Sequence, residues 1–276
     1  MKQLQGRVAV VTGAAGGVGR ALAFALAHAG MDVALADLAE VELEPLAEAL
    51  RALGRRTIAV PTDVSDPRAL ERLLQRTLAE LGGCHLMCNN AGVFHAAPLL
   101  EASEAQWERV LGVNLWGVVH GCRVFGAHFA QQGEGHLLNT ASAAGLFPVP
   151  GMSSYSTSKF AVVGLSQQLR WELAVHGVGV TVLCPGVLKT SMGRAAGVGL
   201  DHLDLEEMVR KAPTPEALAK KAVRAIRHNR AMVIYGPEAQ VFRLLRCLPA
   251  WITDPIGRFM AREALKAVRP PAPPAT

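Results

Sequence analysis

Seven short apolar runs alternate with longer helix-like segments along this chain, and that alternation restricts its possible folds more than any other feature. The runs are Val8–Val11, Val33–Ala36, Thr57–Val60, Leu86–Cys88, His136–Asn139, Val180–Cys184 and Met232–Ile234. Short apolar strands separated by helices are typical of a parallel sheet with helices on both faces. We therefore predict an α/β fold, a doubly wound seven-stranded parallel sheet, in a single domain of residues 1–267.

A glycine-rich turn, Thr12-Gly13-Ala14-Ala15-Gly16-Gly17-Val18-Gly19, follows the first apolar run and precedes an Ala-rich, helix-like stretch. A buried strand, a tight turn and a helix N-terminus aim backbone N–H groups at one point, where a pyrophosphate can bind. The glycine spacing is Gly-x-x-x-Gly-x-Gly, because position 22 is Leu. The alternative is a turn that only joins a strand to a helix.

Tyr155 and Lys159 are four residues apart, and Tyr155 is one of only 2 tyrosines in 276 residues. One turn of helix would place the phenol and the ammonium on the same face. A free phenol has a pKa of about 10, so its use as a base near neutral pH requires a decrease of roughly 3 units, or about 4 kcal/mol. A lysine charge about 5 Å away contributes roughly 3 kcal/mol at an effective dielectric constant of about 20. The pair is a candidate acid/base, although alone it could be an ordinary helical pair.

Taken in order, the motifs of this chain resemble those of the short-chain dehydrogenase/reductase family, in its single-domain form. The resemblance covers about residues 5–236 and rests on Thr12-Gly-x-x-x-Gly-x-Gly19, Asn89-Asn90-Ala91-Gly92, Asn114, Ser142, Tyr155-x-x-x-Lys159 and Pro185-Gly186. It implies a Rossmann-type domain and an NAD(P)-dependent enzyme that acts on CH–OH groups.

The family's catalytic residues correspond to four positions of this chain. By resemblance, Tyr155 transfers a proton, and Lys159 supports its ionisation and binds the nicotinamide ribose. Ser142 would orient the substrate oxygen, and Asn114 would hold a water that links Lys159 to solvent. A positioned base suits this chemistry, because a hydride can leave carbon only if the hydroxyl proton also leaves. The alternatives are that Ser142 only caps backbone and that Asn114 only satisfies a helix break.

The cofactor site is expected to consist of the glycine turn and the loops that follow the other strands. By resemblance it contains Gly13, Gly17, Val18, Gly19, Asp37, Asp63, Val64, Asn90, Ala91, Gly92, Tyr155, Lys159, Pro185, Gly186, Val187 and Thr190.

Asp37 at the end of the second strand favours NAD over NADP. Its carboxylate can accept hydrogen bonds from ribose hydroxyls and would repel a 2′-phosphate. Family members that prefer NADP usually carry Lys or Arg at the positions of Gly16 or Leu38, whereas Arg20 keeps some NADP use open. Asp37 could alternatively be a helix N-cap.

The expected substrate site is almost entirely apolar. By family analogy it contains Phe94, Ser142, Ala144, Phe147, Met152 and Met192, with His95 as a further polar candidate. Such a lining suits a hydrophobic secondary alcohol or ketone. Plain core packing is the alternative for the Phe and Met residues.

Charge and cysteine usage argue against several other classes. The net charge is +5, but the basic residues are dispersed, so we predict no nucleic-acid partner. The 5 cysteines are scattered without the clustering of metal ligands, so we predict reduced thiols and no metal. No apolar run is long enough to span a membrane and a strand begins almost at the N-terminus, which predicts a cytoplasmic protein.

The last third of the chain departs from the alternation. Residues 187–212 interrupt it and, by resemblance, form a substrate lid. Residues 238–267 predict a helical extension whose apolar positions Val241, Leu244, Leu245 and Leu248 recur at helical spacing, with Pro249 limiting its length. We expect it to pack in a homodimer or homotetramer, with contact to an anionic membrane as the less favoured alternative. Residues 268–276 are Pro-rich and predict a disordered tail.

Two other functions fit the same motifs. A 3-oxoacyl-carrier-protein reductase would use NADPH, and Asp37 argues against it. A non-catalytic NAD-binding regulator would share the fold. The presence of Ser142, Tyr155 and Lys159 argues against a regulator, because a pure sensor needs no base.

Overall fold

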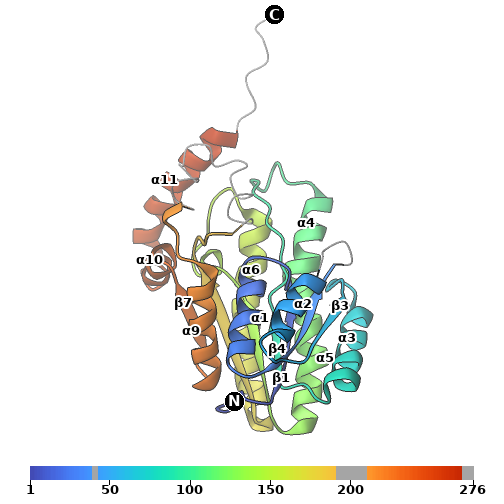
Figure 1. Ribbon diagram of the computed structural model, residues 1–276. Coiled ribbons are helices and arrows are strands. Elements are labelled where there is room, and N and C mark those ends of the chain that lie inside the picture. Colours follow the sequence, from blue (N-terminus) through green and yellow to red (C-terminus); the bar gives the residue numbers. More distant parts are fainter. Residues whose placement is uncertain (39–42, 191–209, 269–276) are drawn as a thin grey trace, which may run out of the picture.

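The computed structural model describes residues 1–38, 43–190 and 210–268, and its seven strands form one parallel sheet (Figure 1). The strands are β1 (Val8–Thr12), β2 (Asp32–Asp37), β3 (Thr57–Pro61), β4 (Leu86–Asn89), β5 (Gly135–Thr140), β6 (Val178–Pro185) and β7 (Met232–Tyr235). Their order is β3-β2-β1-β4-β5-β6-β7, and every neighbouring pair is parallel. The predicted fold is confirmed.

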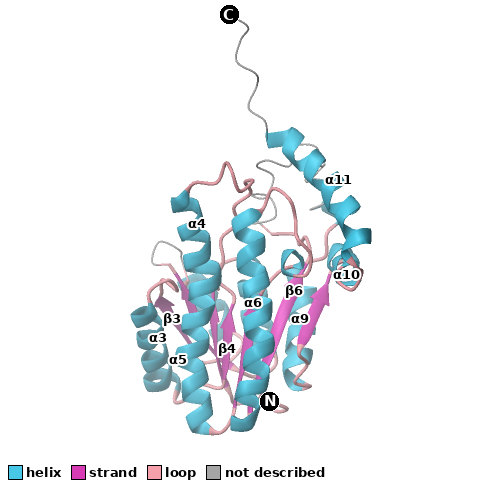
Figure 2. Cartoon of the chain, turned by 180° about the vertical axis from the view of Figure 1, so that it is seen from behind, coloured by secondary structure: helices cyan, strands magenta, loops and turns pink. Residues whose placement is uncertain are grey.

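Helices cover both faces of the sheet. Helices α1 (Gly17–His28), α2 (Glu44–Arg51) and α9 (Pro215–Arg227) cover one face (Figure 1), whereas α3 (Pro67–Leu81), α5 (Gly117–Gln132) and α6 (Ser153–Glu172) cover the other (Figure 2). The side chains of β1 alternate accordingly: Ala9 and Val11 pack in one apolar cluster, and Val8 and Val10 in the other. This burial on both faces explains why each strand reads as a continuous apolar run.

A long helical segment follows β4. Helix α4 (Glu104–Leu111) begins at a capping box in which the Ser103 hydroxyl accepts from the Gln106 N–H and the Gln106 side chain accepts from the Ser103 N–H. The π-helical turn η1 (Gly112–Trp116) then leads into α5. In the described part of the chain, Glu104–Gln132 is the only helix long and apolar enough to span a membrane. Its α5 portion packs against β4 and β5, as a core helix of the sheet does.

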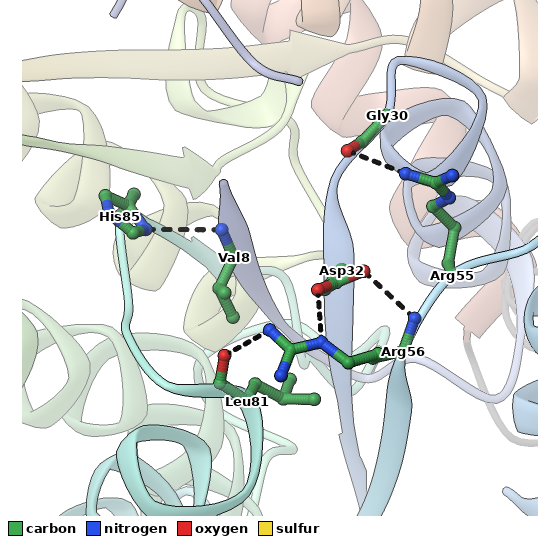
Figure 3. Close-up of polar contacts among 7 residues, drawn as sticks. All are labelled: Val8, Gly30, Asp32, Arg55, Arg56, Leu81 and His85. Atoms are coloured by element: carbon green, nitrogen blue, oxygen red, sulfur yellow. Dashed lines mark hydrogen bonds and ion pairs between the residues drawn. The ribbon is translucent and has the colours of Figure 1, made fainter. Parts of the chain in front are cut away.

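The amino ends of the first strands are tied together by polar contacts (Figure 3). Arg56 donates from its backbone N–H and its Nε to the two carboxylate oxygens of Asp32, at 2.9 and 2.8 Å, and from Nη2 to the Leu81 carbonyl at 2.5 Å. The Val8 N–H donates to Nδ1 of His85 at 3.2 Å. These contacts join β1, β2, β3 and the C-terminus of α3 at the amino ends of the strands. The carboxyl ends of the strands, on the opposite side of the sheet, remain available for ligand binding.

Two helices follow β7. Helix α10 (Pro237–Leu245) ends before Pro249, and α11 (Ala250–Val268) continues beyond the edge of the sheet (Figures 1 and 2). The helical extension predicted for residues 238–267 consists of these two helices, which are separated near Pro249. Of the predicted lid, residues 191–209 lie outside the described part of the chain, and so does the Pro-rich stretch from residue 269 on.

Candidate active site

A cavity of about 820 Å³ opens at the carboxyl ends of the strands. This edge of a parallel sheet is where open α/β folds bind ligands. The predicted site residues that line it are Gly13, Gly17, Val18, Asp37, Asp63, Val64, Asn90, Ala91, Gly92, Phe94, Ser142, Ala144, Met152, Tyr155, Lys159, Pro185, Gly186, Val187 and Thr190. Segments far apart in sequence therefore surround one volume.

Two glycines of the turn after β1 are required by close packing. Gly13 has a φ of +63°, and a Cβ there would lie 2.8 Å from the Cα of Ala91. A Cβ at Gly19 would lie 1.9 Å from the Gly13 carbonyl oxygen. Gly19 does not line the cavity; instead it allows the first turn of α1 to pack against the glycine loop.

The N-terminus of α1 is suited to an anion. Its N-cap is Gly16, a residue that has no side chain to cap the first-turn N–H groups. Gly16, Gly17 and Val18 line the cavity, so these donors lie at its wall. A helix N-terminus at a glycine turn fits the pyrophosphate of a dinucleotide.

Asp37 has a structural contact that the sequence did not predict. Its Oδ2 accepts from the N–H of Ala15 at 3.0 Å, and its Oδ1 accepts from the N–H of Leu38 at 2.9 Å. The next helix begins at Glu44, so Asp37 is not its N-cap. The carboxylate thus braces the glycine turn and also lines the cavity, where its remaining lone pairs can accept from ribose hydroxyls.

The loop after β4 is fixed to β1 through Thr12. The Thr12 hydroxyl accepts from the N–H groups of Asn90 and Ala91 at 3.0 and 3.1 Å and donates to the Cys88 carbonyl at 3.2 Å. The Asn90 amide donates to the carbonyls of Thr12 and Gly13 at 3.0 and 3.3 Å. These bonds hold Asn90, Ala91 and Gly92 against the glycine turn.

Asn114 lies one layer behind the cavity wall, in the π-helical turn η1. It is fully buried and does not line the cavity. Its Oδ1 accepts from the N–H of Val93 at 2.8 Å, and its Nδ2 donates to the Val93 carbonyl at 2.9 Å and to the Ser158 hydroxyl at 3.3 Å. Its side chain therefore joins the loop after β4 to helix α6.

Ser142, Tyr155 and Lys159 all line the cavity. Tyr155 and Lys159 lie on α6, and the Lys159 Nζ is 5.6 Å from the centre of the Tyr155 ring. Nζ donates to the Thr140 carbonyl at 3.1 Å. Phe94 packs edge-on against the Tyr155 ring, with ring centres 5.0 Å apart.

Burial dominates the ionisation of this pair. It raises the pKa of Tyr155, a shift partly opposed by the hydrogen bond with Ser142. It lowers the pKa of Lys159 from 10.5 to about 8. Burial therefore opposes the decrease in the phenol pKa that the spacing of Tyr155 and Lys159 favours, because desolvation disfavours the charged form of each group.

The substrate end of the cavity is largely apolar. Phe94, Ala144, Val149 and Met152 line it. Phe147 is buried behind this wall and contacts Phe242, with ring centres 5.6 Å apart. His95 does not line the cavity, and Met192 lies outside the described residues.

Several lining residues were not predicted from sequence. Those on the helices at the rim include Glu108 and Arg109 on α4, Glu238 and Phe242 on α10, and Met260 on α11. Glu238 and Phe242 are one helical turn apart just after the seventh apolar run, which was an available signal. The place of Met260 in the cavity wall could be seen only in the tertiary structure, because it depends on the direction in which α11 runs.

A doubly wound parallel sheet with a glycine turn at its ligand-binding edge defines a dinucleotide-binding α/β domain. The sequence profile described as short chain dehydrogenase matches residues 7–199. The chain belongs to this family of NAD(P)-dependent oxidoreductases, which act on CH–OH groups.

Named relatives are similar over most of the chain. The putative oxidoreductase SadH of Mycobacterium tuberculosis is 36% identical over 89% of this chain and 91% of its own length. The probable oxidoreductase EphD of the same organism is 34% identical over 87% of this chain, which spans 43% of that longer protein. A short chain dehydrogenase/reductase from Burkholderia phymatum, solved in complex with NAD, has a TM-score of 0.79 and 33% identity, with full coverage of both chains.

Proposed function

We propose that this protein transfers a hydride between NAD and a hydrophobic secondary alcohol or ketone. One observation carries the proposal: Ser142, Tyr155 and Lys159 lie in the same cavity as the glycine turn and Asp37. A dinucleotide bound at the turn could therefore extend to the tyrosine.

The residues that would hold the cofactor lie along the cavity. The N–H groups of the α1 N-terminus would bind the pyrophosphate, Asp37 the adenosine ribose, and Asp63 and Val64 the adenine side. Gly19 would support the turn without touching the ligand. The bound nicotinamide would supply the hydride donor or acceptor. The NAD in the Burkholderia structure and the carboxylate of Asp37 support NAD over NADP.

Tyr155 would exchange the substrate proton. Its hydroxyl would take the proton of an alcohol during oxidation and return it during reduction. At neutral pH Lys159, whose pKa is about 8, is mostly protonated, and its charge favours the phenolate. Ser142 would orient the substrate oxygen. Asn114 would position the loop after β4 relative to α6. The water that Asn114 is expected to hold between Lys159 and solvent stays a prediction.

The apolar wall supports the substrate class. Phe94, Ala144, Val149, Met152 and Phe242 offer carbon surface and few polar partners. Two further relatives agree in chemistry: 3beta-hydroxysteroid dehydrogenase 2 of Eggerthella lenta, 35% identical over 69% of this chain, and 1-deoxy-11-beta-hydroxypentalenate dehydrogenase of Streptomyces exfoliatus, 39% identical over 68%. Their names describe dehydrogenases of a hydroxypentalenate and of a hydroxysteroid.

We also propose that the protein is a homodimer or homotetramer. Helices α10 and α11 expose large apolar side chains, among them Leu244 at 68%, Trp251 at 77% and Phe259 at 66% exposure. The same two helices supply Phe242 and Met260 to the wall of the cavity. An exposed apolar surface of this kind suits contact with a second copy of this chain.

The experiment is a spectrophotometric screen of secondary alcohols and ketones with NAD and NADP in parallel, using wild type, Tyr155→Phe and Tyr235→Phe. Tyr235 is the other tyrosine and does not line the cavity. Tyr155→Phe should bind NADH normally and lose kcat by about a thousandfold or more, whereas Tyr235→Phe keeps its activity. Retention of more than about a tenth of kcat in Tyr155→Phe would contradict the proposed base.

A further inference from the structure

Glu238 is the acidic residue of α10 that lines the cavity, and none of the motifs above assigns it a function. It lies in the first turn of α10, directly after Pro237. Its Oε2 is buried and has no hydrogen-bond partner among the residues that the structure describes. A buried acceptor left without a donor costs about 1–3 kcal/mol, so its retention at a cavity wall calls for an explanation.

Two glycines make room for this carboxylate. A Cβ at Gly186 would lie 2.5 Å from Oε2, and a Cβ at Gly236 would lie 3.2 Å from it. Gly186 follows β6 and Gly236 follows β7, and these two strands are paired neighbours. The carboxylate therefore lies at the carboxyl edge of the sheet, beside the Pro185-Gly186 segment that lines the cavity.

The same face of α10 contributes an apolar neighbour. Phe242 is one turn after Glu238, lines the cavity and contacts Phe147. The helix thus offers the ligand one acceptor within an otherwise apolar wall. Single polar groups in apolar pockets usually fix the orientation of a ligand.

A purely helical role does not account for this placement. An acidic side chain in a first turn interacts favourably with the helix dipole, and Glu216, directly after Pro215 in α9, has the same position. Glu216 is exposed and lies away from the cavity, whereas the Oε2 of Glu238 is buried against two glycines. The dipole interaction requires neither burial nor a place in the cavity wall.

We propose that Glu238 is a specificity-determining residue that accepts a hydrogen bond from an N–H or O–H donor of the ligand in the cavity. The inference rests on the proposed function, since it concerns the same cavity. Two sources carry that chemistry: the carboxamide N–H of the nicotinamide, or a second hydroxyl of the substrate, remote from the reacting carbon.

The test compares ligands that differ only in the donor. Binding of NADH is measured beside that of the reduced 3-acetylpyridine analogue, which lacks the amide N–H, for wild type, Glu238→Leu, Glu238→Gln and the matched control Glu216→Leu. In parallel, kcat/KM is measured for an alcohol substrate and for a diol that adds one remote hydroxyl.

If the carboxamide is the donor, Glu238→Leu weakens NADH binding by about tenfold and leaves binding of the analogue unchanged. If a substrate hydroxyl is the donor, Glu238→Leu lowers kcat/KM by about tenfold for the diol and leaves the simple alcohol unchanged. In either case Glu238→Gln, which keeps an acceptor oxygen, recovers part of the loss, and Glu216→Leu behaves like wild type.

Equal losses for all ligands would mean that Glu238 only supports the fold, and no loss would mean that it meets no ligand donor; both results overturn the inference. Turnover that still requires Tyr155 would then leave the proposed function standing. Conversely, Glu238→Leu could weaken binding of NADH but not of the analogue in a protein that oxidises no alcohol. That result would contradict the proposed function and leave the inference on Glu238 standing.

Discussion

At the scale of one residue, Lys159 shows how a side chain proposed for function can lower the stability of the fold. It is 4% exposed, and its Nζ has a hydrogen bond to the Thr140 carbonyl but no ion pair in the described part of the chain. Its pKa falls from 10.5 to about 8 because burial disfavours the charged ammonium. The unfolded chain therefore binds this proton more tightly than the folded protein does.

We expect Lys159→Met to stabilise the protein at pH 7 while abolishing turnover. The shift of the Lys159 pKa from 10.5 to about 8 corresponds to on the order of 3 kcal/mol of destabilisation below pH 8. As pH rises through this window, the unfolded state holds more protons, so the free energy of unfolding of wild type rises toward that of the variant. Urea unfolding of both proteins at pH 7 and near pH 10 measures the difference between their free energies of unfolding, which should be smaller at the higher pH. A variant less stable than wild type at pH 7 would show that the bond to Thr140 matters more than desolvation.

We expect Asp37 to determine the choice between NAD and NADP. Asp37→Ser with Leu38→Arg should remove the repulsion and supply a partner for a 2′-phosphate, so that kcat/KM favours NADP. Serine keeps an acceptor near the N–H of Ala15, which Asp37 now binds at 3.0 Å. The control Leu38→Arg alone should still favour NAD. If the ratio of kcat/KM for NADP to that for NAD is unchanged in the double variant, Asp37 only stabilises the glycine turn.

At the scale of elements, the first turn of α1 depends on contact between two backbone segments. Because a Cβ at Gly19 would overlap the Gly13 carbonyl, Gly19→Ala must move the helix or the turn. Helix α6 offers a matched control in Gly164, where a Cβ would meet nothing within 4 Å.

Gly19→Ala should destabilise the protein by about 1–3 kcal/mol and weaken NADH binding, because the N–H groups of the turn are displaced. Gly164→Ala should leave binding unchanged and stabilise α6 by up to about 1 kcal/mol. Urea unfolding and NADH titration of both variants provide the measurement. Normal NADH affinity in Gly19→Ala would show that the turn tolerates the displacement.

At the scale of the whole molecule, α10 and α11 connect the cavity to the exposed surface. They supply Phe242 and Met260 to the cavity wall and present Trp251 and Phe259 to solvent. A cytoplasmic location and the absence of a nucleic-acid partner stay predictions.

We expect Trp251→Ser with Phe259→Ser to lower the mass measured by light scattering, because the double variant removes apolar surface from the proposed contact between copies. Leu100→Ser, at a residue 96% exposed in the loop before α4, is the control. An unchanged mass would exclude this surface from assembly. Co-sedimentation of wild type with anionic vesicles at low salt would instead favour the membrane alternative.

The sequence by itself determined the sheet, its seven strands and the glycine turn. Strands that are buried on both faces must be apolar at every position, so each strand appears in the sequence as an apolar run. The turn packs so closely at Gly13 and Gly19 that it excludes side chains, so it appears in the sequence as a glycine motif. The Tyr155 and Lys159 pair was also visible, because one helical turn brings the two side chains to the same cavity.

Only the tertiary structure decided which side chains share the cavity from distant elements. Asp37 bonds to Ala15, Asn114 lies behind the wall, and Glu238 reaches the space left by Gly186. It also decided the ionisation of Tyr155 and Lys159, because desolvation depends on everything packed around a group and not on its neighbours in sequence. The spacing of residues in the sequence determines the geometry within one helix, strand or turn. Burial and contacts between distant segments are determined only when the whole chain folds.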